Sequence, residues 1–198
     1  MGRVTAGFTM SLDGFIANPD DTVAPLFRWY DSGDTPFTTP DGTMTWHVSA
    51  ASVDVLRDMM QSTGALVVGR HLFDITDGWK GRHPIDTPIV VLTHHPPESW
   101  IEHHPDAPFT FVEGIEAAIE KAKELADGKD VGIGGSEAIQ QAIRAGLVDE
   151  IGVDLAPFLL GEGVRVFDHL GSTTIELERT MAVEGTDVTH LRFRVVKP

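Results

Sequence analysis

The sequence predicts an α/β protein with a mainly parallel sheet, flanked by helices and closed by a C-terminal antiparallel hairpin. Three short apolar runs, at residues 65–68, 89–92 and 131–133, suit strands buried inside a parallel sheet. Two further stretches, residues 174–183 and 188–196, alternate apolar and polar side chains around a short turn, as in a hairpin at a sheet edge. Parallel strands with intervening helices, followed by such a hairpin, give a mixed sheet.

Composition limits the class of protein and its partners. The 198 residues, 41% of them hydrophobic, suffice for one domain with a full core, which we place at residues 1–198. Thirty acidic against fifteen basic residues give a formal charge of −15, which argues against binding nucleic acid or an anionic membrane. The absence of cysteine excludes disulfides, thiolate nucleophiles and cysteine-bound metals. With no signal-peptide pattern and no run of about 18 apolar residues, a cytoplasmic protein is expected.

A first strand and a long loop are predicted at the start of the chain. Residues 4–10 form the strand, residues 11–14 turn, and residues 15–17 continue into the loop. Residues 19–47 are rich in Pro, Gly, Asp and Thr, and their aromatic side chains need something to cover. The loop is either a lid over a substrate, or a subunit contact or a patch over the core. Its aromatic residues include Phe27, Trp29, Tyr30, Phe37 and Trp46.

Helices are predicted between the strands. Residues 49–61 carry an apolar stripe at helical spacing, and Gly64 follows as a stop signal. Residues 109–112 form a short strand, and an amphipathic helix follows over residues 115–125. Residues 151–155 alternate as a further strand, which a proline ends.

The centre of the chain has the pattern strand, glycine turn, helix, strand. The strand at residues 131–133 breaks at Gly134 and Gly135, and Ser136 is a good N-cap for the helix that follows. Gly146 stands where a left-handed C-terminal cap of that helix is expected. The glycine turn therefore lies directly before a helix N-terminus.

Such a turn suits a diphosphate. Without Cβ atoms a ligand can lie against the backbone, and the helix N-terminus offers unpaired N–H groups and a partial positive charge. The pattern departs from the dinucleotide-binding fingerprint, because Glu137 occupies the place of its third glycine. The alternative interpretation is a tight turn whose glycines serve only packing.

Four segments resemble one family. They read TMSLDGFIA at residues 9–17, LVVGRHLFD at 66–74, IVVLTHHP at 89–96 and GGSEAIQQAIRAGLVDEIGVDLAPFLLGEGVRVF at 134–167. In this order they resemble the reductase domain of bacterial bifunctional riboflavin deaminase-reductases, a branch of the dihydrofolate reductase-like superfamily, over nearly the whole chain. The resemblance implies a dihydrofolate reductase-like three-layer fold and an NADPH-dependent oxidoreductase. The implied substrate is a pteridine, a pyrimidine or a related small heterocycle.

The resemblance also implies where NADPH lies. The glycine turn would cradle its diphosphate, and residues after the strands at 65–68 and 89–92 would hold the adenosine half with its 2′-phosphate. Arg70 is a planar cation that can fork onto a phosphate, although a structural salt bridge is the alternative. For Met10 the alternative is core packing. The cofactor-binding residues so assigned are Thr9, Met10, Gly69, Arg70, His71, Thr93, His94, Gly134, Gly135, Ser136, Glu137 and Ala138.

Two carboxylates are the catalytic candidates. In dihydrofolate reductases a carboxylate near the start of the corresponding helix binds the pterin, and Asp54 is the acidic residue nearest that place in this chain. The alternative for Asp54 is a solvated residue on the helix face. Asp13 is the second candidate, and its alternative is an aspartate that bonds its own turn before Gly14.

Departures from the family limit what the resemblance says about substrate. Ile133 stands where the riboflavin reductases are expected to carry an acidic substrate-binding residue, and the deaminase domain is absent. A stand-alone reductase for another heterocycle fits better than a strict riboflavin-pathway role. The alternative is a non-catalytic nucleotide- or protein-binding module that retains the fold. The terminal hairpin and the family resemblance both favour a homodimer.

Paired histidines invite a metal site. They occur at His94-His95 and His103-His104, but adjacent residues in extended chain point in opposite directions, and no His-x-x-x-His spacing supports a site. We therefore assign no metal ligands.

Overall fold

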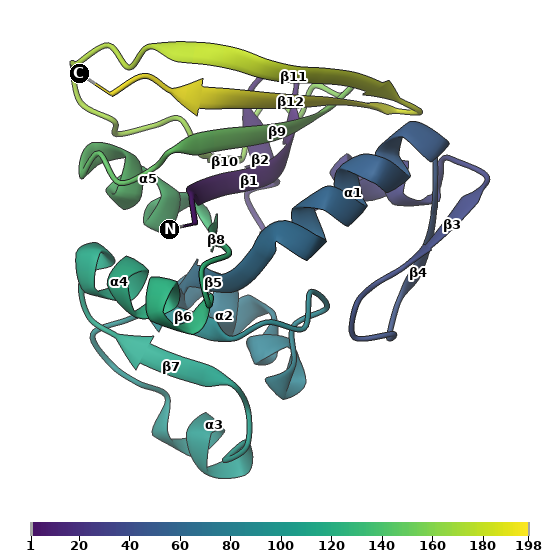
Figure 1. Cartoon of the computed structure of the whole chain (residues 1–198). Helices are drawn as coiled ribbons and strands as arrows, with labels where there is room; N and C mark the ends of the chain where they lie inside the picture. Colours follow the sequence, from purple (N-terminus) through teal and green to yellow (C-terminus); the bar gives the residue numbers. More distant parts are fainter. Residues whose placement is uncertain (1, 198) are drawn as a thin grey trace.

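A computed structural model describes residues 2–197, and one eight-stranded sheet runs through it (Figure 1). The six strands from β9 to β7 are mutually parallel, while β12 runs antiparallel to β9, and β11 to β12. The predicted mixed sheet with a C-terminal hairpin at its edge is confirmed. In sheet order the strands are β11 (Leu177–Gly185), β12 (Val188–Val195), β9 (Glu150–Ala156), β1 (Val4–Ser11), β8 (Asp130–Gly134), β5 (Thr63–Gly69), β6 (Ile89–Leu92) and β7 (Phe109–Val112).

Helices cover both faces of the sheet, which gives the predicted three layers. In Figure 1, α4 (Ile115–Leu125) and α5 (Ser136–Arg144) lie to the left of the sheet and α1 (Ala50–Ser62) lies to the right. The shorter α2 (Arg70–Ile75), η2 (Asp77–Gly81) and α3 (Glu98–His103) follow β5 and β6. Within residues 2–197 no helix is long and apolar enough to cross a lipid bilayer.

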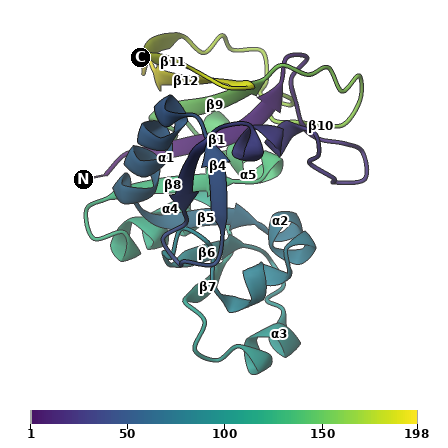
Figure 2. The ribbon, with the colours of Figure 1, turned by 90° about the vertical axis from the view of Figure 1, so that its right-hand side faces the viewer.

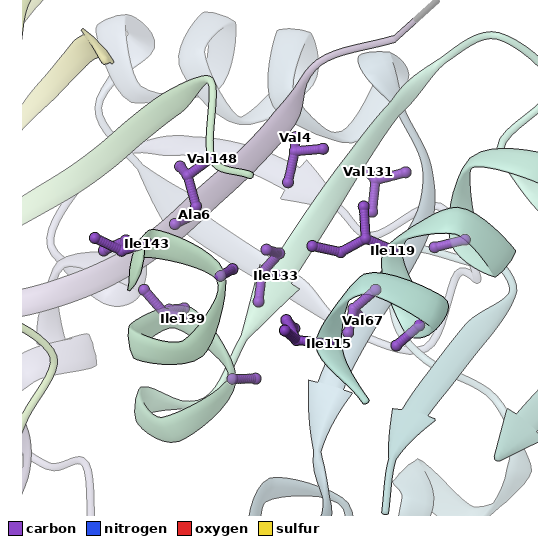
Figure 3. Close-up of a cluster of buried hydrophobic side chains, with 14 of the residues drawn as sticks. Val4, Ala6, Val67, Ile115, Ile119, Val131, Ile133, Ile139, Ile143 and Val148 are labelled. Atoms are coloured by element: carbon purple, nitrogen blue, oxygen red, sulfur yellow. The ribbon is translucent and has the colours of Figure 1, made fainter. Parts of the chain in front are cut away.

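The main core lies between the sheet and the helices α4 and α5 (Figure 3). Side chains on a strand alternate between faces, so Val4 and Ala6 of β1 and Ile133 of β8 point into this core. Ile119 and Ile139 meet them from the two helices. The intervening residues of β1 consequently face α1, and these carry the polar and small side chains used below.

The central strands β1 and β8 pair over a short distance only. Their ladder joins Val4 to Val131 and ends at Ala6 and Ile133, whereas β1 pairs with β9 as far as Ser11. Gly7 and Gly134 are the next residues on the two strands. β1 and β8 therefore pair with each other only near their amino ends. Toward its carboxyl end β1 pairs with β9 alone.

The long segment of residues 19–47 has structure of its own. It contains η1 (Leu26–Asp31) and a hairpin of β3 (Thr35–Thr38) and β4 (Thr45–Val48), which Figure 2 shows in front of the sheet. Tyr30 stacks between Phe27 and Trp46, with centroid distances of 5.3 and 4.0 Å. Trp29 is buried against α1. The aromatic residues pack on the core and on one another.

Two predicted helix boundaries were wrong. Ser136 is the first residue of α5 rather than its N-cap, because Gly135 takes the cap position with φ 89° and ψ 135°, a conformation that glycine adopts without strain. Gly64 does not end α1, since Thr63 caps that helix and Gly64 lies within β5. A Cβ at Gly64 would come within 2.3 Å of the Ala126 carbonyl oxygen, so the glycine serves close packing.

A small sheet closes the turn after β1. In it β2 (Phe15–Ala17) pairs antiparallel with β10 (Val164–Arg165), and the guanidinium of Arg165 lies 4.0 Å from the centre of the Phe15 ring. This contact brings the segment after β9 next to the end of β1.

Candidate functional site

Three turns at the carboxyl edge of the sheet carry the predicted cofactor residues other than Thr9 and Met10. They follow β8, β5 and β6, which are neighbours in the sheet and parallel. Gly134 and Gly135 follow Ile133 on β8, while Arg70 and Thr93 come directly after β5 and β6. Ligands of open α/β sheets bind at this edge. The residues that the resemblance assigns to NADPH on these three strands thus lie at one edge of the sheet.

The glycine turn leaves the start of α5 open. Gly135 caps the helix without a side-chain hydrogen bond, so the amide groups of the first turn point out of the helix without a side-chain acceptor. Glu137 is exposed and makes no ion pair with residues 2–197, so its carboxylate is turned to solvent. Ala138 is fully buried and lies against Gly69, where a Cβ would meet its methyl at 3.8 Å. The turn therefore presents backbone amides that no side chain of residues 2–197 caps.

Arg70 and Thr93 meet across neighbouring strand ends. Arg70 donates through Nε to Asp74 at 2.7 Å, and through Nη1 to the Thr93 hydroxyl at 3.5 Å and to the His95 carbonyl. The Thr93 hydroxyl in turn accepts from the His95 amide at 3.2 Å. The guanidinium thus makes the structural salt bridge that was the alternative interpretation, and it is also held at the edge beside the glycine turn.

The two histidines of the predicted site are exposed. His71 Nε2 lies 2.9 Å from Asp21, and His94 Nδ1 lies 2.9 Å from Glu113. Their side chains are 66% and 74% exposed, respectively. Both rings therefore stand at the surface, each beside a carboxylate.

Thr9 and Met10 of β1 lie on opposite faces of the sheet. Thr9 faces α1, and its hydroxyl accepts a hydrogen bond from the Trp29 indole at 3.3 Å. Met10 packs against the main core, which agrees with the alternative of core packing. Only Thr9 adjoins the α1 side of the sheet.

Asp13 is fixed by donors from a distant segment. It accepts from the Ser11 hydroxyl at 2.6 Å and from the backbone amides of Leu160 and Gly161 at 3.1 and 2.7 Å. These bonds, the Ser11 hydroxyl first, lower the pKa of Asp13 to about 2. Asp13 is therefore a permanent carboxylate that ties the turn after β1 to the segment after β9.

Asp54 lies in a different place from the glycine turn. It borders a groove of about 1590 Å³ between α1 and the sheet, is 75% exposed, and pairs with Arg57 at 2.7 Å. The groove continues to the amino ends of the strands, and Gly7 and Gly152 are among the residues on its sheet side. The structure thus places Asp54 at the groove on the α1 face of the sheet, away from the turns that carry the predicted cofactor residues.

The sequence did not reveal a buried polar network beside this groove. His190, which is fully buried, lies 2.8 Å from Asp154 through Nδ1 and 2.8 Å from the Ser52 hydroxyl through Nε2. Arg192 also donates to Asp154, at 3.2 Å. The residues come from α1, β9 and β12, so no short spacing in the sequence could have indicated the network.

Comparison with known proteins agrees with this architecture. An uncharacterized protein, YwjB, of Bacillus subtilis (strain 168) is 23% identical over 167 residues, which are 83% of this chain and 82% of that protein. A crystal structure described as a putative riboflavin biosynthesis protein from Shewanella sp. PV-4 superposes with a TM-score of 0.70 at 22% identity, covering 98% of this chain and 99% of that one.

Dihydrofolate reductase from Enterococcus faecalis, complexed with NADP(H), gives a TM-score of 0.58 at 17% identity, covering 99% of this chain and 98% of that one. The family model described as the RibD C-terminal domain matches residues 3–191. The chain belongs to the RibD C-terminal domain family and has the dihydrofolate reductase-like fold.

Proposed function

We propose that the protein is an NADPH-dependent reductase that transfers a hydride to a small flat heterocycle such as a pteridine or pyrimidine. The observation that carries the proposal is the end of the ladder between β1 and β8. There, Gly7 on the wall of the α1 groove and Gly134 of the glycine turn lie on neighbouring strands, just past the last pair, Ala6 and Ile133. A cofactor bound at the turn and a substrate in the groove would adjoin at this point.

In the proposal, different residues bind different parts of the cofactor. In the proposal the amides of the glycine turn, residues 134–138, hold the diphosphate at the start of α5. Arg70, kept in place by Asp74 and Thr93, holds a phosphate of the adenosine half. NADPH supplies the hydride, while the protein binds, orients and excludes water.

The predicted catalytic carboxylates receive different roles. Asp13, with its pKa of about 2, supplies no proton at neutral pH and instead positions the end of β1. Asp54 stands on the groove rim, where its exposed carboxylate can contact a substrate. A similar structure supports a reductase: the riboflavin biosynthesis reductase Rib7 of Saccharomyces superposes with a TM-score of 0.62 at 13% identity.

We also propose a cytoplasmic homodimer. The strand β11 forms one edge of the sheet and presents unpaired backbone groups over Leu177–Gly185, and Leu177 is 40% exposed. Such an edge is a ready surface for pairing with a second copy. Light scattering of the purified chain tests the dimer, and a mass of 21.5 kDa would contradict it.

Titration with NADPH and with NADH tests the proposal directly. Nicotinamide fluorescence and thermal unfolding should show micromolar NADPH binding and NADH binding weaker by about 10-fold or more, because one charged phosphate contact is worth this much. Turnover of a pterin or pyrimidine with NADPH would then establish the activity. Failure of both dinucleotides to bind would contradict the reductase and favour the non-catalytic module.

A further inference from the structure

One polar contact joins the loop after β2 to the helix α2. Asp21 Oδ2 lies 2.9 Å from His71 Nε2, and the two residues are 50 positions apart in the sequence. The loop follows β1 and β2, and α2 follows β5, but β8 lies between β1 and β5 in the sheet. Figure 2 shows the loop, in dark purple, at the right of the molecule together with α2 and α5. The contact therefore spans the carboxyl end of β8, where the glycine turn lies.

Short-range hydrogen bonds give this part of the loop, residues 18–22, a defined shape. The Asp21 amide donates to the Asn18 carbonyl at 3.0 Å, and the Asn18 amide donates to the Thr22 carbonyl at 2.9 Å. The Thr22 hydroxyl donates to Asp20 at 2.7 Å. Asp21 has φ 64°, a left-handed conformation that aspartate and asparagine adopt more often than most residues. A turn that its own hydrogen bonds stabilise therefore presents the Asp21 carboxylate to His71.

His71 stands beside the glycine turn, because the first turn of α2 packs against that turn. A Cβ at Gly135 would come within 3.5 Å of Leu72 Cβ and 3.6 Å of the Gly69 nitrogen. A Cβ at Gly134 would come within 3.2 Å of the Leu72 side chain. His71 lies between Gly69 and Leu72 in the sequence, and its side chain is 66% exposed. Its ring is therefore a surface hydrogen-bond donor near the uncapped amides of α5.

Asp21 opposes an anion at the glycine turn in two ways. A carboxylate only accepts hydrogen bonds, so His71 Nε2 donates to it and must leave it before donating to a phosphate. Among residues 2–197 Asp21 pairs only with His71, so a neutral ring leaves its negative charge uncompensated. Adjacent strands are about 4.8 Å apart, within the Debye length of about 8 Å at physiological ionic strength. The charge of Asp21 would therefore repel a diphosphate at the end of β8.

The other exposed histidine beside a carboxylate at this edge is arranged differently. His94 Nδ1 also lies 2.9 Å from its partner, Glu113, and the two side chains are 74% and 71% exposed. They follow β6 and β7, which are adjacent in the sheet, so no strand end lies between them. Of the two contacts, that of Asp21 with His71 is the one that crosses the glycine turn.

We propose that the contact between Asp21 and His71 is an autoinhibitory latch, which a diphosphate must displace in order to bind at the glycine turn. The proposal rests on the proposed function, because the diphosphate is that of the dinucleotide. His71 Nε2 then has two alternative acceptors, the Asp21 carboxylate in the free protein and a phosphate oxygen in the complex. Since release of the latch and binding are linked, a change that weakens the latch strengthens binding.

Isothermal titration of the full chain with NADPH and with NADH tests the latch through Asp21→Asn. Asparagine keeps the left-handed backbone and removes the charge. This variant should bind both dinucleotides about 3-fold more tightly, as for the loss of one surface ion pair, and by the same factor because both share the diphosphate. Asp20→Asn is the matched control, since it removes an equal charge one residue away and its side-chain oxygen can still accept from Thr22. It should change either affinity by less than about 1.5-fold.

Hydrogen exchange followed by mass spectrometry tests the latch without a cofactor. In His71→Ala the amides of residues 18–22 should exchange about 3-fold faster than in wild type, because the loop loses its partner while its own sequence is unchanged. His94→Ala is the control and should leave the exchange of these amides unchanged, because His94 pairs with Glu113.

Equal dinucleotide affinity in wild type and Asp21→Asn, or weaker binding by Asp21→Asn, would overturn the latch and leave the proposed function intact. Unchanged exchange in His71→Ala would also overturn it. If neither dinucleotide binds, the proposed function fails, and inorganic pyrophosphate is titrated instead. About 3-fold tighter binding of pyrophosphate to Asp21→Asn would then support the latch, whereas equal binding or none would overturn it.

Discussion

The two halves of the sheet, which meet at the short ladder between β1 and β8, offer a ligand different kinds of groups. On the side of β8, β5, β6 and β7 the candidate site consists of turns, with Gly135 at φ 89° and with mostly exposed side chains such as His71 and His94. On the side of β1, β9 and β12 it consists of strand side chains, with His190 fully buried and bonded at both nitrogens. The first half presents mainly backbone groups, whereas the second presents side chains that their neighbours hold in place.

The largest expected effect comes from a substitution in the buried polar network on the side of β9 and β12. Replacement His190→Leu removes the hydrogen-bond partner of Asp154 and Ser52 inside the protein, and should lower the free energy of unfolding by about 2–5 kcal/mol, because each group left unpaired costs about 1–3 kcal/mol. Urea denaturation measures it. The control is His94→Leu, also a histidine beside a carboxylate but 74% exposed, for which a change within about 0.5 kcal/mol is expected. Equal changes in the two variants would contradict the contrast.

The next largest effect is expected from a substitution in the glycine turn. Gly135→Asp puts a side chain on a left-handed residue and a negative charge at the phosphate position, so NADPH affinity should fall by about 100-fold. Gly114→Asp is the matched control, because Gly114 caps α4 with φ 86° and ψ 136°, nearly the same backbone. It should carry the same strain and leave NADPH affinity within about three-fold. Equal loss in both would show that strain, not the site, is responsible.

A smaller effect tests the cation at the same edge. Arg70→Ala should weaken NADPH binding by about 10- to 30-fold and NADH binding much less, because the lost contact is to a phosphate. Isothermal titration of both dinucleotides measures this. Arg82→Ala is the control, since Arg82 also pairs with an aspartate four residues on, Asp86, at the surface. If Arg70→Ala binds NADPH as wild type does, Arg70 serves its salt bridge alone.

The last prediction concerns a pH dependence outside the site. Burial lowers the pKa of His83 to about 4, against about 6.5 in the unfolded chain, despite the charge of Asp41. The unfolded chain therefore takes up a proton first, and stability present above pH 6.5 is lost as pH falls from 6.5 to 4. The lowered aspartate pKa values, such as that of Asp13, act below this window. As the pH is lowered from 6.5 to 4, the melting temperature of His83→Gln should fall less than that of wild type. Identical slopes of melting temperature against pH in the two proteins would contradict the assignment to His83.

Local signals explain how much of the fold the sequence could predict. β-branched runs, the glycine pair and the alternating terminal stretches each depend on neighbours in sequence, and they gave the strands, the turn before α5 and the hairpin. Even Gly146 at φ 68° after α5 was predictable, because helix ends use a left-handed residue. The family resemblance then predicted the order of the parts.

The site was harder to predict because its contacts are distant in sequence. Asp13 bonds Leu160 and Gly161, which lie 147 and 148 residues away, so the turn before Gly14 did not reveal its role. His190 and Asp154 meet only because β12 and β9 pair in one register. A shift of one residue would turn His190 to the other face of the sheet.

The short ladder between β1 and β8 also has a mechanical meaning. Three register pairs, the last at Ala6 and Ile133, join these central strands, whereas seven join β1 to β9. We therefore expect the sheet to bend more easily along the line between β1 and β8 than along the line between β1 and β9. Motion about it changes the separation of Gly7 and Gly134. A molecule bound across the line between β1 and β8 would therefore restrict this bending and make the sheet more rigid.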